Sequence, residues 1–318
     1  MKAITLANNG GTENLHFTEI PTPEINEDEV LIRVKAIGIN PVDAFARREP
    51  AAIGRFVKPA PGEKVVIGWD VSGVVEAAGA RVRVCKPGDE VFGMVNFPGH
   101  GKAYAEYVAA PAAQLALKPG NISHEEAAAS TLAALTAWQA LVTYGKVRQG
   151  DKVLIHGAGG GVGHYAVQIA RHFGAYVIGT GSASKRDFVL RLGANQFIDY
   201  TAARFEEVVQ DADLVVDSLF GDHIFRSLAT VKPGGRVIAL LASFTDEKLA
   251  GLVREKNVYA HTLGVVSNGR DMEQIAALLQ SGELRSHISA TYPFTDMAKA
   301  HAEIERGKTL GKIVVTLP

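Results

Sequence analysis

The sequence predicts an α/β protein in which a doubly wound parallel sheet is joined to an antiparallel β domain. Three observations predict it. Strand-like and helix-like segments alternate over residues 151–266. Short β-branched segments, separated by Pro and Gly turns, fill about the first 120 residues. A glycine turn at residues 157–163 leads from an apolar strand straight into an amphipathic helix.

In the antiparallel domain we expect strands at residues 29–36, 73–77, 90–95 and 104–109, separated by turns such as residues 86–89. Ser123 as N-cap and Glu126 three residues later form a capping box, which predicts a helix from residue 124. Near the end of the chain we expect a helix over 296–306 and a strand over 312–317. A strand this late in the sequence is expected to return to the first domain.

In the parallel sheet we expect strands at residues 152–156, 176–180, 196–199, 213–218, 235–241 and 257–266, with helices between them. Residues 232–235 are expected to form a turn that precedes the fifth strand. We therefore assign residues 1–122 and 267–318 to the antiparallel domain, and residues 123–266 to the nucleotide-binding domain.

Composition fits a globular enzyme. The chain has 318 residues, of which 47% are hydrophobic, and a net charge of −1, which gives no electrostatic reason to expect nucleic acid or a membrane surface as partner. There is no apolar run of about 18 residues that could span a bilayer, and no charged start followed by an apolar segment. We therefore expect a cytoplasmic location. The single cysteine, Cys85, excludes an intrachain disulfide.

The glycine turn is the feature that bears most directly on function. Its bare amides and the positive end of the following helix suit a dinucleotide pyrophosphate, and glycine lets the backbone approach the phosphates. The alternative is a glycine turn with no ligand. The glycine motif of dinucleotide-binding turns can be aligned with this segment in two registers. One begins at Ala158 and the other at Gly157, and both include Gly160 and Gly163. The predicted contacts are Gly157, Ala158, Gly159, Gly160, Gly161, Val162 and Gly163.

The residues after the second strand indicate which nicotinamide cofactor binds. An NAD site would place an acidic residue there, but this chain has Ser182, Ser184, Lys185 and Arg186. Small and cationic residues favour the 2′-phosphate of NADP(H). Alternatively, the two cations only lie at a solvated helix start. Because ligands bind beyond the carboxyl ends of parallel strands, the cleft is also expected to include Tyr200, Ser218 and Leu240.

Several further segments resemble one family in order and spacing. The chain is similar to the medium-chain dehydrogenases/reductases, in their zinc-independent quinone oxidoreductase (zeta-crystallin-like) branch. The matching segments are GINPVD (38–43), GWDVSGVV (68–75), GDEVFG (88–93), AYAEY (103–107), LTAWQAL (135–141), the glycine turn, IDY (198–200) and AHAE (300–303).

The resemblance implies a GroES-like catalytic domain, a Rossmann domain, NADPH as hydride donor, and quinones or other α,β-unsaturated carbonyls as acceptors. It places Asn40 and Thr136 beside the nicotinamide and Lys185 and Tyr200 beside the 2′-phosphate. Ser218 would lie near the ribose or pyrophosphate. The resemblance also implies a homodimer through the last Rossmann strand, whose edge a monomer would have to protect, for example with residues 267–270.

Zinc-dependent members of the superfamily place a Cys just after the first matching segment and a Gly-His-Glu where this chain has Gly68, Trp69 and Asp70. Neither His100 nor His156 has a second Cys or His at ligand spacing, so we predict no metal. Each histidine is better explained by a structural role.

Without a metal, the acceptor's carbonyl oxygen needs a hydrogen-bond donor as charge develops on it. Asn40 is the predicted catalytic donor or orienter; its alternative role is a turn-stabilising amide beside Pro41. An apolar wall for a planar acceptor is predicted from Phe45, Trp69, Phe92 and Phe97, with Trp69 equally suited to the core. Two other readings stay open: an NADP(H) alcohol or aldehyde reductase that has lost zinc, and a non-enzymatic NADPH-binding protein.

Overall fold

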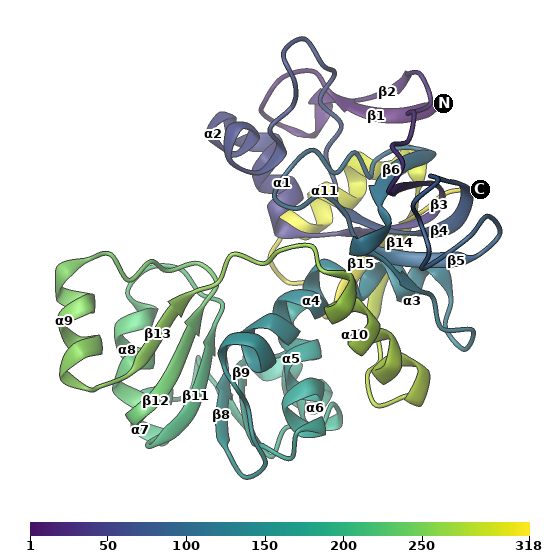
Figure 1. Ribbon diagram of the computed structural model, residues 1–318. Helices are drawn as coiled ribbons and strands as arrows, with labels where there is room; N and C mark the ends of the chain where they lie inside the picture. Colours follow the sequence, from purple (N-terminus) through teal and green to yellow (C-terminus); the bar gives the residue numbers. More distant parts are fainter. The chain divides into compact units, whose positions relative to one another are not determined.

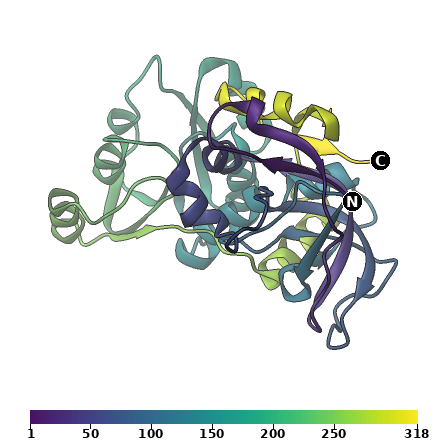
Figure 2. The ribbon, with the colours of Figure 1, turned by 90° about the horizontal axis from the view of Figure 1, so that it is seen from above.

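The computed structural model describes residues 1–318, and the chain divides into two compact units. Unit 1 contains Met1–Leu135 and Val265–Pro318, so that both ends of the chain belong to it (Figures 1 and 2). Unit 2 contains Thr136–Gly264. None of the helices is long and apolar enough to cross a bilayer.

Unit 1 is built on a seven-stranded sheet with an attached hairpin. Its strands run in the order β14-β15-β3-β4-β5-β7, with β6 also paired to β3, and every pair except β14 with β15 is antiparallel. The strands are β3 (Glu29–Ile39), β4 (Asp70–Ala78), β5 (Glu90–Met94), β6 (Tyr107–Pro111), β7 (Ala116–Leu117), β14 (Ile288–Pro293) and β15 (Lys312–Thr316). The hairpin pairs β1 (Lys2–Leu6) with β2 (Leu15–Glu19).

The long strand β3 shows why this sheet forms. Alternate side chains, including Val30, Ile32 and Val34, are buried, which is the period of two that a strand with one core face requires. Strand β15 pairs with β3, confirming that the last strand returns to the first domain. The helices of this unit are α1 (Pro41–Arg48), α2 (Pro50–Ala52), α3 (His124–Ala129), α10 (Gly269–Ser281) and α11 (Met297–Glu305).

The capping box at the start of α3 is confirmed. The Ser123 hydroxyl accepts from the Glu126 backbone N–H at 3.2 Å, and the Ser123 N–H donates to the Glu126 carboxylate at 2.9 Å. Ala128 and Ala129 of this helix pack with Ala36 and Val314 in the core of unit 1. Because α3 buries its apolar face there, the unit extends to Leu135, whereas the sequence placed the division at residue 122.

Unit 2 is a doubly wound Rossmann domain, as predicted. Six parallel strands run in the order β10-β9-β8-β11-β12-β13. They are β8 (Lys152–Ile155), β9 (Tyr176–Gly181), β10 (Gln196–Asp199), β11 (Ala212–Asp217), β12 (Val231–Ala239) and β13 (Tyr259–Thr262). Figure 1 shows α5 (Gly161–His172) and α6 (Arg186–Arg191) on one face of the sheet. The other face carries α7 (Phe205–Val208), α8 (His223–Thr230) and α9 (Glu247–Glu255). Helix α4 (Leu132–Trp138) crosses the division between the units.

Several of the predicted strand bounds differ from the structure. Strand β13 has four residues instead of ten, and β6 begins at Tyr107 instead of Tyr104, whose side chain is fully buried. The turn expected at residues 232–235 lies inside β12. The pairing with β11 shifts there from Ala212–Val231 to Leu214–Arg236, so these residues bulge out of the strand instead of preceding it.

Candidate functional site

The glycine turn of unit 2 has the geometry of an anion cradle. Gly157 has a φ of +62°, Gly160 is the N-cap of α5, and a Cβ on Gly163 would lie 2.2 Å from the Gly157 carbonyl oxygen. A positive φ and this close approach each require glycine. Ala158 is instead buried and donates its N–H to the Thr180 carbonyl at 2.9 Å. The structure therefore favours the register that begins at Gly157.

The first turn of α5 supplies the charge of the cradle. The leading N–H groups of a helix have no intrahelical acceptor, and the helix dipole adds positive potential there. In this helix those groups belong to Gly161, Val162 and Gly163. Two of these residues carry no side chain, which suits the close approach of a phosphate.

The loop after β9 brings together the residues expected beside a 2′-phosphate. Ser182 and Ser184 lie 3.1 Å apart between their hydroxyl oxygens, and Lys185 is half-buried, so that burial lowers the pKa of its ammonium. The Tyr200 N–H donates to the Gly181 carbonyl at 3.2 Å, which places this exposed tyrosine beside the same loop.

A carboxylate that the sequence analysis did not consider also lies near this loop. Asp199 ends β10 and is the register partner of Gly181 at the end of β9. Its Oδ1 accepts the N–H and the hydroxyl of Thr201, at 3.0 and 2.8 Å. The carboxylate is thus directed to its own turn. The pairing of β9 with β10 could not be read from residue order alone.

Ser218 follows β11, the strand beside β8, and Leu240 follows β12, the next strand of the sheet. The Ser218 hydroxyl donates to the His156 carbonyl at 3.0 Å, and the Leu240 N–H donates to the Asp217 carbonyl at 2.8 Å. The turn, the loop after β9, Ser218 and Leu240 all lie at the carboxyl ends of the parallel strands. Thr136 lies in α4 and is 6% exposed.

In unit 1, Asn40 lies in a buried polar network. It precedes α1, and its backbone N–H donates to the Asp43 carboxylate at 2.7 Å. Its Nδ2 donates to Asp70 at 2.7 Å, and its Oδ1 accepts from the Lys312 ammonium, which also donates to the Ile39 carbonyl at 2.9 Å. Lys312 lies 3.7 Å from Asp70, and both are buried. Lys312 could not be found from the sequence, because only folding brings it to Asn40.

Burial dominates the electrostatics of this network. It raises the pKa of Asp43 to about 8, with help from the Asp70 charge, and it raises the pKa of Asp70. It lowers the pKa of Lys312. Two carboxylates thus face one ammonium in a buried site, which favours retention of a proton on one of the two carboxylates.

A buried histidine lies in the same unit. Burial and the Arg47 charge lower the pKa of His301 to about 3, and this histidine bonds to the Tyr104 hydroxyl at 2.9 Å.

The predicted apolar wall divides into exposed and buried parts. Trp69 and Phe92 have no exposed surface, and the Trp69 indole N–H donates to the Gly99 carbonyl at 2.7 Å, so both pack in the core and present nothing to a ligand. Phe45 is 40% exposed. Phe97 stacks on Phe56 with ring centroids 5.8 Å apart, and Phe56 contacts Phe45 at 6.2 Å. Phe56, which was not among the predicted residues, lies between these two rings.

The donor groups of this chain do not fit zinc. The Asp70 carboxylate, which lies in the segment that holds a ligand in zinc-dependent relatives, bonds to Asn40 and to the Leu132 N–H. His100 pairs with Glu63 at 3.0 Å, and no group of three or more His, Cys, Asp or Glu side chains is arranged to hold a metal ion.

Comparison with known proteins agrees with this description. Residues 26–120 match the alcohol dehydrogenase GroES-like domain, and residues 192–315 match the zinc-binding dehydrogenase family. An NADPH-dependent alkenal/one oxidoreductase of Arabidopsis thaliana is 34% identical over 99% of this chain and 79% of its own length. The human quinone oxidoreductase is 30% identical over 100% of this chain and 98% of its own.

Among solved structures, the quinone oxidoreductase from Coxiella burnetii superposes with a TM-score of 0.90 and 32% identity, over 100% of this chain and 99% of that one. A GroES-like unit and a Rossmann unit with a glycine cradle define an oxidoreductase of the medium-chain dehydrogenase/reductase family. Within that family, this chain belongs to the quinone oxidoreductase branch.

Proposed function

We propose that this protein is an NADPH-dependent reductase that transfers hydride to quinones or other α,β-unsaturated carbonyls without a metal. The observation that carries the proposal is the glycine cradle at the N-terminus of α5, with Ser182, Lys185 and Tyr200 grouped at the neighbouring loop. The names of the relatives, quinone oxidoreductase and alkenal/one oxidoreductase, support the same acceptors.

Each part of the cofactor and of the acceptor is assigned to residues of this chain. The cradle amides bind the pyrophosphate, Lys185 and the two serines bind the 2′-phosphate, and Ser218 lies near the ribose or pyrophosphate. When bound, the cofactor supplies the hydride. Asn40 is the proposed donor to the acceptor's carbonyl oxygen: its Nδ2 has two N–H groups and gives one to Asp70, so one remains. Phe45 and Phe97, with Phe56, supply an apolar surface for a planar acceptor.

The cofactor preference is tested by titrating the protein with NADPH and NADH. One charge-assisted contact to the 2′-phosphate should make the Kd for NADPH at least about tenfold lower. Lys185→Ala should narrow that difference. Arg191→Ala is the matched control, because Arg191 is an exposed cation in the last turn of α6, the helix that begins beside Lys185. Equal dissociation constants in the unmodified protein would contradict the assignment.

The acceptor class is tested by following NADPH oxidation with 9,10-phenanthrenequinone, an alkenal and a simple ketone in parallel. We expect turnover with the first two, before and after treatment with a chelator. Turnover of the ketone alone would favour the alcohol or aldehyde reductase. Binding without any turnover would favour a non-enzymatic role. Loss of activity on removal of stoichiometric zinc would contradict the metal-free proposal.

We also infer a homodimer formed through β13. This strand is an edge of the six-stranded sheet, with β12 on one side. The Leu263 N–H donates to the Ala239 carbonyl of β12, so by strand alternation the N–H of Thr262 points away from β12, to the open edge. Pairing two such edges about a two-fold axis would satisfy these groups.

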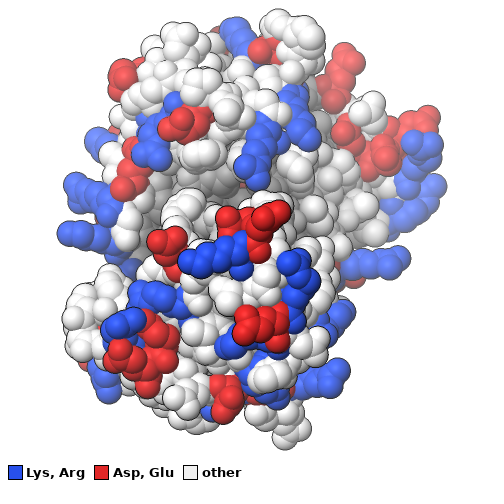
Figure 3. Space-filling view, turned by 90° about the vertical axis from the view of Figure 1, so that its left-hand side faces the viewer, with Lys and Arg blue, Asp and Glu red and all other residues white.

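For location we propose the cytoplasm, and we propose no nucleic acid or membrane partner. Positive and negative side chains are intermixed on the face shown in Figure 3, and the net charge is −1. Neither observation supports an extended charged surface for such partners. Fractionation of cells that express a tagged chain tests the location.

A further inference from the structure

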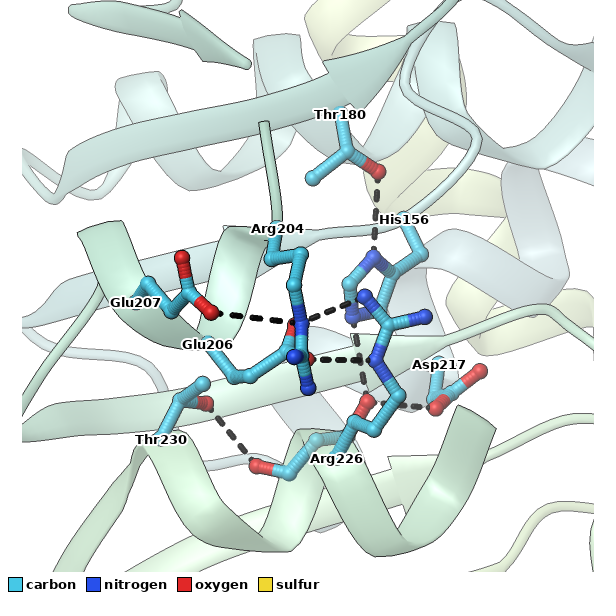
Figure 4. Close-up of polar contacts among 9 residues, drawn as sticks. His156, Thr180, Arg204, Glu206, Glu207, Asp217, Arg226 and Thr230 are labelled. Atoms are coloured by element: carbon cyan, nitrogen blue, oxygen red, sulfur yellow. Dashed lines mark hydrogen bonds and ion pairs between the residues drawn. The ribbon is translucent and has the colours of Figure 1, made fainter. Parts of the chain in front are cut away.

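A buried chain of polar side chains joins three strand ends in unit 2 (Figure 4). His156 Nδ1 lies 3.0 Å from the Thr180 hydroxyl, and His156 Nε2 lies 3.1 Å from the Ser227 hydroxyl. Ser227 in turn bonds to Asp217 Oδ2 at 2.6 Å. All four residues are at most 2% exposed. None of the four has been given a role in the function proposed above.

The chemistry of the groups fixes the direction of each hydrogen bond. The Ser227 hydroxyl donates to Asp217 Oδ2. Ser227 then accepts from His156 Nε2–H. Burial lowers the pKa of His156 to about 4, so the ring is neutral near pH 7, and its Nδ1 accepts from the Thr180 hydroxyl. Every member of the chain is satisfied in this one arrangement.

Three of these residues directly precede the loops that the proposed function assigns to the cofactor. His156 follows β8 and precedes Gly157 of the glycine turn. Thr180 is followed by Gly181 and Ser182, and Asp217 ends β11 and is followed by Ser218. The fourth member, Ser227, comes from α8 and ties that helix to the strand ends.

An aromatic ring packs against His156, and an ion pair lies beside that ring. The Phe205 ring meets the His156 imidazole with centroids 4.4 Å apart, and the Arg226 guanidinium lies 4.6 Å from the centroid of Phe205. Arg226 is held by two hydrogen bonds to Glu206, at 2.9 and 2.7 Å. Fully satisfied polar networks in such a site specify one arrangement of the elements that carry them.

We propose that His156 is a positioning residue for the dinucleotide site: its imidazole fixes the ends of β8, β9 and β11 relative to one another, and thereby the spacing of the glycine turn, Ser182 and Ser218. This rests on the proposed function. Ser227 is not a nucleophile, because its hydroxyl is fully buried. The hydrogen bond between His156 and Thr180 holds the loop after β9, which would bind the 2′-phosphate. The hydrogen bonds from His156 through Ser227 to Asp217 hold Ser218.

The two links predict different effects on the two cofactors. Thr180→Val removes the hydroxyl that reaches His156 and should raise the Kd for NADPH about three- to tenfold, with a smaller change for NADH. Thr180→Ser keeps the hydroxyl and should restore the Kd for NADPH. Ser227→Ala breaks the link to Asp217 and should weaken both cofactors by similar factors.

Thr230→Val is the matched control. Thr230 is buried in α8, the helix that carries Ser227, and its hydroxyl donates to the Ser227 carbonyl at 2.8 Å (Figure 4). This hydrogen bond stays within the helix and does not reach the ends of the strands. This variant should lower Tm as Thr180→Val does, and should leave both dissociation constants unchanged. A role limited to stability would make the two variants alike in cofactor binding.

Hydrogen exchange of the protein without cofactor tests the same idea independently of binding. Thr180→Val should speed exchange of the amides at residues 157–163 and 181–185, and Thr230→Val should not. The inference is wrong if the two variants exchange alike. It is also wrong if Thr180→Val exchanges faster but keeps the wild-type ratio of the dissociation constants for NADPH and NADH. If the wild-type protein binds neither cofactor, the proposed function is wrong, and the exchange result still decides whether His156 fixes these loops.

Discussion

Lys312→Met is predicted to destabilise unit 1 because it removes the one ammonium that faces two buried carboxylates. The Lys312 Nζ lies 3.7 Å from Asp70, and the two side chains are 2% and 0% exposed. At an effective dielectric constant of about 20, that separation corresponds to about 4.5 kcal/mol of attraction. Removing one partner of a buried pair typically costs about 3 to 5 kcal/mol. We expect a loss in this range at pH 7.

Trp69 provides a local probe for this experiment. The chain has two tryptophans, and Trp69 is buried in unit 1 whereas Trp138 belongs to unit 2. In a Trp138→Phe background, urea unfolding followed by fluorescence reports the free energy of unfolding of unit 1. The double variant Lys312→Met/Asp70→Asn should recover part of the loss, since it leaves one fewer uncompensated charge.

The pH dependence adds a second check. Without Lys312 the folded-state pKa of Asp70, already raised by burial, should rise further. A carboxyl whose folded pKa exceeds its unfolded value weakens the fold as pH rises through that window, so the loss should shrink toward pH 4. Lys308→Met, at an exposed position, is the control and should stay within about 0.5 kcal/mol of the parent. A loss below about 1 kcal/mol at pH 7, or one that is constant from pH 4 to 8, would refute the reasoning.

Three further predictions follow from single contacts. Gly163→Ala should weaken NADPH binding by about 100-fold or more, because its Cβ would lie 2.2 Å from a backbone oxygen, whereas Gly160→Ala, at 3.2 Å, should cost less than about tenfold in a fluorescence titration. Burial raises the folded pKa of Asp43 from 3.8 to about 8, so stability should fall as pH rises through this range; Asp43→Asn should flatten the urea-unfolding profile by up to about 1.4 kcal/mol per pH unit, and an unchanged slope would count against it. Thr262→Pro should convert the dimer to a particle near 33.8 kDa in light scattering, because it removes an outward N–H without breaking the β12 pairing; the same low mass in the unmodified protein would end the dimer proposal.

Features set by neighbouring residues could be predicted from the sequence. The glycine cradle, the capping box at Ser123 and the parallel strands of unit 2 were all expected, because turn chemistry and hydrophobic periodicity act over a few residues. The strand ends were less accurate. Strand β13 is shorter than its apolar run, since the strand ends where pairing with β12 ends, and composition does not encode that point.

Features that depend on distant residues were decided by the tertiary structure. An apolar side chain suits a core or a pocket wall equally, and only packing shows that Trp69 and Phe92 belong to the core and that Phe56 joins Phe45 and Phe97. The partners of Asn40 show the same dependence: Lys312 comes from the last strand of unit 1, 272 positions away in the chain. Residue order alone does not reveal such a pair, because the pairing of strands β3 and β15 brings the two residues together.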